Sequence, residues 1–373
     1  ELKQKDPDSE ILVIEKERDV GKHASGRNSG VLHAGFYYSA DSLKARFCRE
    51  GNKKWHKFIE DNNLSINRCG KIVVAQNEKE LEGIHTLFGR GEKNDVEIYL
   101  IDEKEARDLE PNVKTFEKAL WSPNTSSVSP GECNLKLREK LEKSGVEFHF
   151  DCRVVGHNDN SIKTTNGSFS ADHIYNCAGL YADKVAHLFG AGKEYTLLPF
   201  KGVYHKCIGD NPVNRHIYPV PNLANPFLGV HFTQTVKGES KIGPTAIPAF
   251  WREHYNGLSG FDIAEFAQVS LCELNLLIRN SFGFRSLALQ EIVKYRASAL
   301  ERDAGNMLNK FMNKTKAMPA GIRAQLLNVK TRELIMDFVV ERQSGVTHVL
   351  NAISPAWTCA FPFAEHVVSM ENN

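Results

Sequence analysis

Residues 11–17, with the sequence ILVIEKE, combine a short run of mostly β-branched apolar residues with an acid near its end. Such a run predicts a buried parallel strand. In dinucleotide-binding folds the acid that ends the second strand hydrogen-bonds a ribose, about 20 residues after a glycine-rich turn. Too few residues precede Glu15 for that turn, and the chain contains no GxGxxG. We therefore expect the first strand of such a fold to lie upstream of residue 1. The alternative is that Glu15 is a solvated turn residue.

The composition argues against several classes of protein. The chain has 373 residues and a formal net charge of +1, so we expect two domains and no nucleic-acid partner. No apolar run approaches the roughly 18 residues of a membrane span. The eight cysteines form no CxxC pair and no zinc-like spacing with histidine, which indicates free thiols in a reducing compartment and no metal site. Because residue 1 is Glu, a targeting sequence cannot be judged.

The order of the predicted elements indicates the fold class. Strand–helix units occur at both ends of the chain, and short strands rich in Pro and Gly occupy the middle. The patterns predict helices over 42–63, 134–145, 262–313 and 354–370, and strands over 69–76, 146–179, 196–250 and 318–350. We predict an α/β (α+β) chain in which a β-rich substrate domain is inserted into a discontinuous Rossmann-like nucleotide-binding domain. The nucleotide-binding domain would comprise 1–75, 120–192 and 314–373, and the substrate domain 76–119 and 193–313.

The loop at residues 23–38, HASGRNSGVLHAGFYY, is rich in both glycine and polar side chains. Glycine permits a close approach of the backbone to another group, or a positive φ, at an entropic cost. Serine, arginine, asparagine and histidine can hydrogen-bond a large polar ligand. The loop alone leaves two interpretations open, a ligand-binding segment and an ordinary turn-rich connection.

Several motifs along the chain resemble the L-2-hydroxyglutarate dehydrogenase/oxidase family, within the glycine/D-amino-acid-oxidase-like FAD flavoproteins. In chain order they are SGRNSGVLHAGFYY with SLKARFC, CGKIVVA, NCAGLYAD, PFKGVYH, IYPVPNLANPFLGVHFT, GPTAIPAFWREHY, PAGIRAQ and NAISPAWT. The resemblance covers nearly the whole chain and implies FAD-dependent oxidation of L-2-hydroxyglutarate to 2-oxoglutarate. It also implies that loop 23–38 runs along the flavin and its pyrophosphate. The residues that would bind FAD are Glu15, Lys16, Ser25, Arg27, Asn28, Ser29, Gly30, Val31, Val154, Ala178, Gly179, Ser354 and Pro355.

Oxidation of a 2-hydroxy acid also needs a base for the hydroxyl proton and cations for the carboxylates. Histidine suits the first task because its ordinary pKa lies near neutrality. The resemblance points to His33 and His231 as catalytic candidates, and the alternative for each is a structural histidine. Arg323 in GIRAQ is the candidate for carboxylate binding, ideally bidentate. Further substrate-binding candidates are Lys201, which stands where the family usually has arginine, Tyr204, and Arg252, whose alternative is an ion pair with Glu253.

The chain departs from the family pattern in two places. In NAISPAWTCAFPFAEH, the residues Trp357, Phe361 and Pro362 replace mostly small residues that approach the flavin. Proline also lacks an N–H donor. Ser127 stands where the family tends to have glycine. Neither change removes a candidate catalytic group, but both affect the expected contacts with the flavin.

Two other functions stay open on this reasoning. One is a related flavoprotein that oxidises another 2-hydroxy acid, an amine or glycerol 3-phosphate, and the other is a truncated, non-catalytic relative. The resemblance suggests an electron acceptor other than NAD, either a membrane quinone or, more slowly, oxygen. Residues 276–296 form either a membrane-surface segment or a packed amphipathic helix. We accordingly expect a cytoplasmic protein or one peripheral to a membrane, mitochondrial in a eukaryote, in an oligomeric state that the sequence does not indicate.

Overall fold

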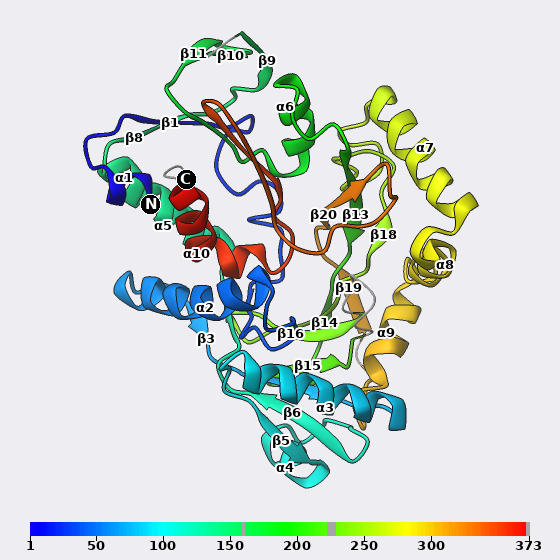
Figure 1. Cartoon of the computed structure of the whole chain (residues 1–373). Coiled ribbons are helices and arrows are strands. Elements are labelled where there is room, and N and C mark those ends of the chain that lie inside the picture. The colour runs from blue at the N-terminus through cyan, green and yellow to red at the C-terminus, as the bar shows by residue number, and fades with distance from the viewer. Residues whose placement is uncertain (159–160, 222–228, 313, 371–373) are drawn as a thin grey trace.

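The computed structural model describes residues 1–158, 161–221, 229–312 and 314–370. It confirms a mixed α/β chain (Figure 1). Residues 222–228, which belong to the motif IYPVPNLANPFLGVHFT, lie outside the described residues. Within the described part of the chain, no helix combines the length and the apolar character needed to cross a membrane.

Two small sheets are built from strands that are far apart in the chain. β1 (Ile11–Ile14) pairs in parallel with β8 (Val146–His149), which confirms the parallel strand predicted from ILVIEKE. β12 (Ile174–Asn176) pairs in parallel with β22 (Val346–Asn351), and β21 (Val339–Gln343) adds an antiparallel edge. Because the carboxyl ends of parallel partners meet at one edge, the segments that follow β12 and β22 lie next to each other.

The largest sheet has eight strands in the order β19-β14-β17-β16-β15-β4-β6-β5. Its strands are β4 (Lys71–Val74), β5 (Tyr99–Asp102), β6 (Lys118–Ser122), β14 (His205–Ile208), β15 (His216–Pro219), β16 (His231–Gln234), β17 (Ser240–Gly243) and β19 (Lys314–Ala317). The neighbours β4 and β15 are parallel. This sheet crosses the predicted domain boundaries, because β4 and β19 were assigned to the nucleotide-binding part. Helix α3 (Glu78–Lys93) packs against β6.

A separate sheet has three strands, in the order β18-β13-β20. β13 (Tyr195–Gly202) pairs along its length with β20 (Gly321–Asn328), and β18 (Ile247–Pro248) joins its other edge. The range 262–313 is largely helical, as predicted, up to Gly305, and Figure 1 shows its helices along one side of the molecule. These are α7 (Ile263–Arg279), α8 (Phe284–Val293) and α9 (Ala297–Gly305).

Helices α2 (Leu43–Asp61) and α10 (Ala356–Ser369) pack closely together. α2 begins after Ser42, whose side chain accepts a hydrogen bond from the Ala45 N–H at 3.1 Å. The ring of buried Trp55 stacks on Trp357 with centroids 4.1 Å apart. Phe361 packs into the same cluster. The bulky residues that depart from the family pattern therefore fill the core between these two helices.

Among the remaining elements, β11-β10-β9 and β2-β7-β3 form two further three-stranded sheets. The remaining elements are α1 (Leu2–Lys5), β2 (Val31–Leu32), β3 (Ile66–Asn67), α4 (Glu103–Leu109), β7 (Ser126–Val128), α5 (Pro130–Lys143), β9 (Val154–Asn158), β10 (Ser161–Thr164), β11 (Gly167–Ser170), η1 (Gly179–Tyr181), α6 (Ala182–Leu188) and η2 (Ser281–Gly283).

Truncation of the aromatic contact between α2 and α10 tests this packing. We expect Trp55→Ala to lower the free energy of unfolding by about 3–5 kcal/mol, because it leaves a cavity against Trp357. The measurement is denaturant unfolding followed by circular dichroism. Tyr99→Ala, at a half-exposed position on β5, is the control and should lose far less stability. Equal losses in the two variants would contradict the packing described here.

Candidate active site

Small, exposed residues gather where the parallel strands end. Cys177, Ala178 and Gly179 follow β12, and Ala352 and Ser354 follow β22; all five are exposed. Gly179 has a φ of +55°, and a Cβ built there would meet no atom within 4 Å. In open α/β sheets, ligands bind outside the carboxyl ends of the strands. This edge therefore fits a dinucleotide, and three of its residues (Ala178, Gly179 and Ser354), together with Pro355, belong to the predicted FAD set.

The segment after β1 carries charges toward the same region. Lys16 Nζ lies 5.4 Å from the ring centroid of Tyr181, which follows the glycine turn at β12. Glu15 accepts a hydrogen bond from the Glu17 N–H at 2.9 Å, so one of its carboxylate oxygens is bound within the turn that follows β1. Val154 begins β9, and the neighbouring Cys152 N–H donates to the Glu15 carbonyl at 2.9 Å. These predicted residues thus lie together beside the end of β1.

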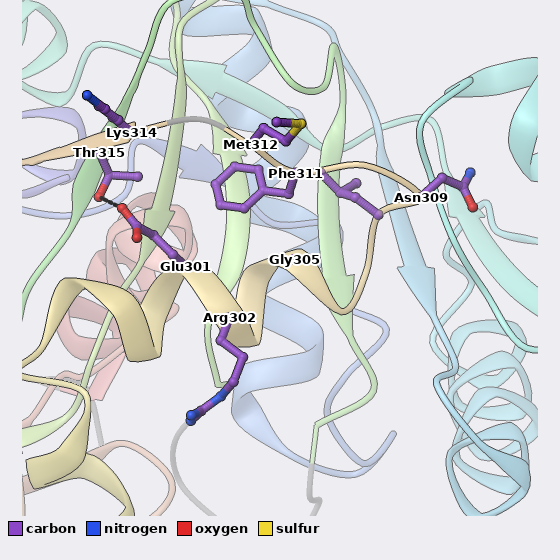
Figure 2. Close-up of a pocket in the computed structure, with 9 residues that line it drawn as sticks. Glu301, Arg302, Gly305, Asn309, Phe311, Met312, Lys314 and Thr315 are labelled. Carbon is purple, nitrogen blue, oxygen red and sulfur yellow. Dashed lines mark hydrogen bonds between the residues drawn. The ribbon is translucent and has the colours of Figure 1, made fainter.

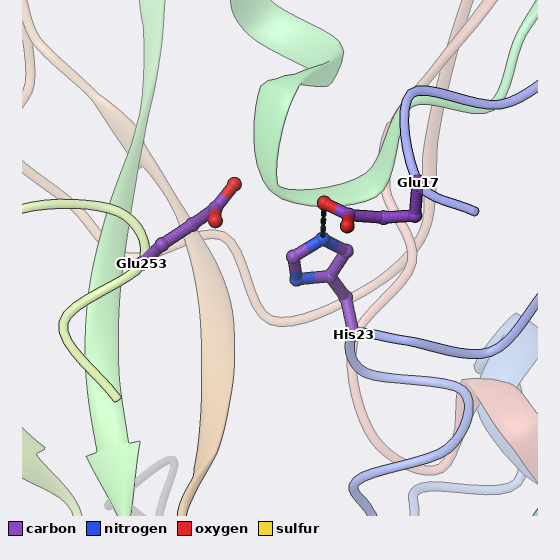
Figure 3. A group of neighbouring side chains, drawn as sticks. All are labelled: Glu17, His23 and Glu253. Carbon is purple, nitrogen blue, oxygen red and sulfur yellow. Dashed lines mark hydrogen bonds and ion pairs between the residues drawn. The ribbon is translucent and has the colours of Figure 1, made fainter. Parts of the chain in front are cut away.

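Glu17, His23 and Glu253 form a compact charged group in this segment (Figure 3). Their ligand atoms lie within 4.8 Å of one another, which is close enough for a metal site. However, Lys16 Nζ bonds both carboxylates, at 2.7 Å from Glu253. The hydrogen bond from Lys16 outweighs burial and lowers the pKa of Glu17 to about 2. Because Lys16 already supplies the positive charge, we interpret the group as an ion-pair network.

The polar residues of loop 23–38 mainly hold the loop in shape. Asn28 accepts from the Gly30 N–H at 2.8 Å and donates to the Ser25 carbonyl at 2.9 Å. Arg27 Nε donates to the Lys22 carbonyl at 2.7 Å. A Cβ on Gly30 would approach a carbonyl oxygen to 2.6 Å at a φ of +75°, so the turn requires glycine. Ser25 and Arg27 remain exposed, whereas Ser29 accepts from the Val31 N–H at 3.3 Å.

Beyond the loop, a group of buried basic side chains surrounds His33. Lys71 Nζ lies 3.4 Å from His33 Nδ1, and the His231 ring stacks on Tyr218 with centroids 3.7 Å apart. His231 Nδ1 is 2.9 Å from the Gly229 carbonyl and donates to it, which leaves Nε2 without a proton in the neutral ring. The structure therefore brings the two predicted histidines together, with additional basic residues that the sequence reasoning missed: Lys71, His216 and Lys241.

Burial sets the ionisation of this group. Desolvation, followed by the Lys71 charge, lowers the pKa of His33 well below its ordinary value. Desolvation lowers the pKa of His231 to about 3, that of Lys71 to about 7 and that of Lys241 to about 8. Both predicted histidines are therefore neutral near pH 7 and available as proton acceptors. Both lysines lose most of their preference for the charged form.

The predicted carboxylate-binding residues do not all face one site. In the pairing of β13 with β20, Arg323 lies opposite Phe200, and Lys201 lies opposite Ile322. Side chains alternate along a strand, so Arg323 and Lys201 point to opposite faces of this sheet. Burial lowers the pKa of Arg323 to about 10. Burial and the Arg323 charge lower the pKa of Lys44 to about 8, so this missed lysine lies near Arg323.

The two other candidates contact residues other than Arg323. Tyr204 lies beside Lys241, whose Nζ is 4.7 Å from its ring centroid. The Arg252 guanidinium makes a bidentate ion pair with Asp183, with both bonds at 2.7 Å and both side chains buried. We therefore leave Arg252 out of the substrate site. Its partner is Asp183, not the neighbouring Glu253 that the sequence suggested.

A cavity of about 700 Å³ opens beside α9, away from these residues (Figure 2). Glu301 and Thr315 face each other at its edge and are joined by a hydrogen bond of 2.6 Å. Its lining residues include none of the predicted site residues. We do not assign it to the active site.

Comparison with known proteins identifies the family. A family model described as FAD dependent oxidoreductase matches residues 1–370. This chain belongs to that family. FAD is accordingly its cofactor, in agreement with the strand-end edge described above.

Individual relatives agree with this assignment. The chain is 33% identical to the mitochondrial L-2-hydroxyglutarate dehydrogenase of Caenorhabditis briggsae, covering 97% of this chain and 87% of that protein. It is 31% identical to the L-2-hydroxyglutarate dehydrogenase of Escherichia coli K12, with the same coverage. Among solved structures, the FAD-bound L-α-glycerophosphate oxidase of Mycoplasma pneumoniae has a TM-score of 0.71 at 21% identity, covering 97% of this chain and 88% of that one. Glycine oxidase of Geobacillus kaustophilus has a TM-score of 0.68 at 14% identity, covering 96% and 88%. These structural similarities establish the fold.

Removal of the Arg252 side chain should act on stability. Arg252→Met leaves the Asp183 carboxylate buried without its counter-charge, and we expect a loss of about 3–5 kcal/mol in the free energy of unfolding. Denaturant unfolding measures this loss. Arg153→Met, at an exposed arginine, is the matched control and should change stability by less than about 0.5 kcal/mol. If Arg252→Met kept normal stability and only its KM for the substrate rose, the result would show that Arg252 binds the substrate.

Proposed function

We propose that this protein oxidises L-2-hydroxyglutarate to 2-oxoglutarate. The observation that carries the proposal is identity of 31–33% to L-2-hydroxyglutarate dehydrogenases of animals and bacteria over 97% of the chain. The small residues at the ends of β12 and β22 would hold FAD. When bound, FAD supplies the acceptor for the hydrogen and the two electrons that leave C2 of the substrate.

The buried basic residues supply what the substrate requires from the protein. Neutral His33 accepts the hydroxyl proton, since its burial keeps it uncharged at pH 7. Arg323 binds a carboxylate, because its planar fork can donate two parallel hydrogen bonds. Lys44 adds a second cation near Arg323. Arg323 and Lys201 point to opposite faces of the sheet, so they do not face the same site. We prefer Arg323 because Lys44, a second cation, lies near it.

A substrate panel tests the proposed reaction. Steady-state assays with an artificial electron-accepting dye should give a kcat/KM for L-2-hydroxyglutarate well above those for its D-enantiomer, glycine and glycerol 3-phosphate. Glycine and glycerol 3-phosphate are included because the two structural neighbours are named glycine oxidase and L-α-glycerophosphate oxidase. A preference for either of them would replace the proposed substrate.

The role of Arg323 can be tested by a conservative change. Arg323→Lys keeps the charge but loses the fork, and we expect kcat/KM for L-2-hydroxyglutarate to fall by roughly 30- to 1000-fold with FAD content unchanged. Arg302→Lys, at an exposed arginine on α9, is the control and should leave kcat/KM unchanged. Unchanged kinetics in Arg323→Lys would exclude Arg323 from carboxylate binding.

We further propose that the protein acts at a membrane surface, with a membrane quinone as electron acceptor. Helices α7 and α8 expose many large apolar side chains, among them Ile263, Leu271, Ile278, Leu289 and Val293, each more than half exposed. An exposed apolar surface of this extent is typical of an interaction site. Exposed Arg279, Arg285 and Arg296 accompany these side chains, and cations of this kind attract anionic lipids. A position at the bilayer would bring the enzyme to a lipid-soluble acceptor.

Vesicle binding tests this second proposal. The protein should sediment with vesicles that contain anionic phosphatidylglycerol, and the triple change Leu271→Gln, Ile278→Gln and Leu289→Gln should abolish sedimentation while leaving dye-coupled activity intact. Light scattering of the protein without vesicles tests the alternative that a second copy of the chain covers this apolar surface. A stable dimer that the triple change dissociates, with no vesicle binding, would show that a second copy covers this surface.

A further inference from the structure

Lys71 occupies an unusual position for a lysine. It lies in β4, where every residue is buried, and its own side chain is fully buried. Among the described residues, no carboxylate pairs with its ammonium group, and the only neighbours that raise the pKa of Lys71 are the thiols of Cys48 and Cys69. A buried lysine is ordinarily paired, because removal of its charge from water is costly. The absence of a counter-charge suggests a role other than an ion pair.

Three aromatic rings take the place of a counter-ion. Lys71 Nζ lies 4.3 Å from the ring centroid of Tyr218, 5.0 Å from that of Tyr37 and 5.6 Å from that of Phe36. Ring faces attract a cation without holding its proton in place. Burial opposes the charged form and lowers the pKa of Lys71 to about 7. Near neutral pH, Lys71 can therefore both gain and lose a proton.

The only hydrogen-bond partner that the structure describes for Lys71 Nζ is His33 Nδ1, at 3.4 Å. At this distance, two buried cations repel each other strongly, so His33 and Lys71 together hold at most one excess proton. The charge on Lys71 is indeed one of the causes that lower the pKa of His33. The other ionisable groups that shift the pKa values of the pair are His216, His231, Cys48 and Cys69, and the tyrosines Tyr37 and Tyr218 face Lys71 through their rings.

We propose that Lys71 is a positioning residue for His33 that sets its tautomer and takes up the proton that His33 receives. This inference rests on the proposed function. With a neutral amine, Lys71 accepts the Nδ1–H of His33, so that Nε2 presents its lone pair. When the substrate O–H bond breaks, an Nε2–H bond forms; the Nδ1–H bond then breaks and a third Nζ–H bond forms. The proton ends as a lysine ammonium within the three rings, and His33 is neutral before and after.

Replacement of Lys71 tests whether flavin reduction depends on proton uptake by Lys71 or only on its positive charge. In wild-type holoenzyme, the rate of flavin reduction by L-2-hydroxyglutarate should rise as the pH passes about 7, because the neutral amine is the active form. Both Lys71→Met and Lys71→Arg should lose about 10²-fold or more in this rate, together with the step near pH 7, since neither can take up a proton. Lys206→Met, at a half-exposed lysine, is the control and should keep both the rate and the step. A Lys71→Arg variant within about threefold of wild type would show that a fixed charge suffices, and would overturn the proposal.

A spectroscopic measurement on the wild-type holoenzyme keeps the proposal testable if the variants fail to fold. Nitrogen NMR of ¹⁵N-histidine-labelled protein, with His33 assigned by comparison with His33→Asn, reports its tautomer directly. Below about pH 7, the Lys71 ammonium should donate to Nδ1 and place the proton on Nε2; above it, the proton should lie on Nδ1. One tautomer throughout about pH 5–9 would overturn the proposal. Since no substrate is needed, this result is independent of whether L-2-hydroxyglutarate proves to be the substrate.

Discussion

The position of His33 depends on buried hydrogen bonds from several elements. The Asn52 amide of α2 donates to the His33 carbonyl at 3.1 Å, and the His33 N–H donates to Thr358 of α10 at 3.3 Å. From the large sheet, Lys241 donates to the Ser29 carbonyl at 2.9 Å. A buried backbone group without a partner is costly, so these bonds strongly disfavour other conformations of the loop. The loop thus joins two helices and the large sheet, and it carries the proposed base at their junction.

Removal of these groups from water then determines their chemistry. The same burial that makes His33 a neutral acceptor makes Lys71 a weak base of nearly neutral pKa. In contrast, Arg252 is equally buried but is paired, with two oxygens of Asp183 at 2.7 Å. The difference between a reactive and a structural cation in this protein is therefore the presence of a carboxylate partner. Neither case can be recognised from the residue type alone.

Much of the fold follows from local sequence patterns. The apolar run at β1 predicts a parallel strand, and the helix predicted from residue 42 begins at Leu43. The helix predicted over 134–145 instead begins at Pro130 and ends at Lys143. The family follows from motifs spread over the chain. The pairing of β4 with β15 brings residues more than 140 positions apart into register, and no local pattern encodes it. For that reason, Lys71 could not be placed beside His216 and Tyr218 from the sequence. A lysine within the apolar strand CGKIVVA was the one available signal.

This chain transfers electrons from L-2-hydroxyglutarate to its bound FAD. Anaerobic titration of the purified holoenzyme, followed by visible absorbance, tests this transfer without any assumption about the final acceptor. We expect one equivalent of L-2-hydroxyglutarate to bleach one equivalent of flavin and to yield one equivalent of 2-oxoglutarate. Flavin absorbance that stays unchanged at saturating L-2-hydroxyglutarate, in protein fully loaded with FAD, would contradict it.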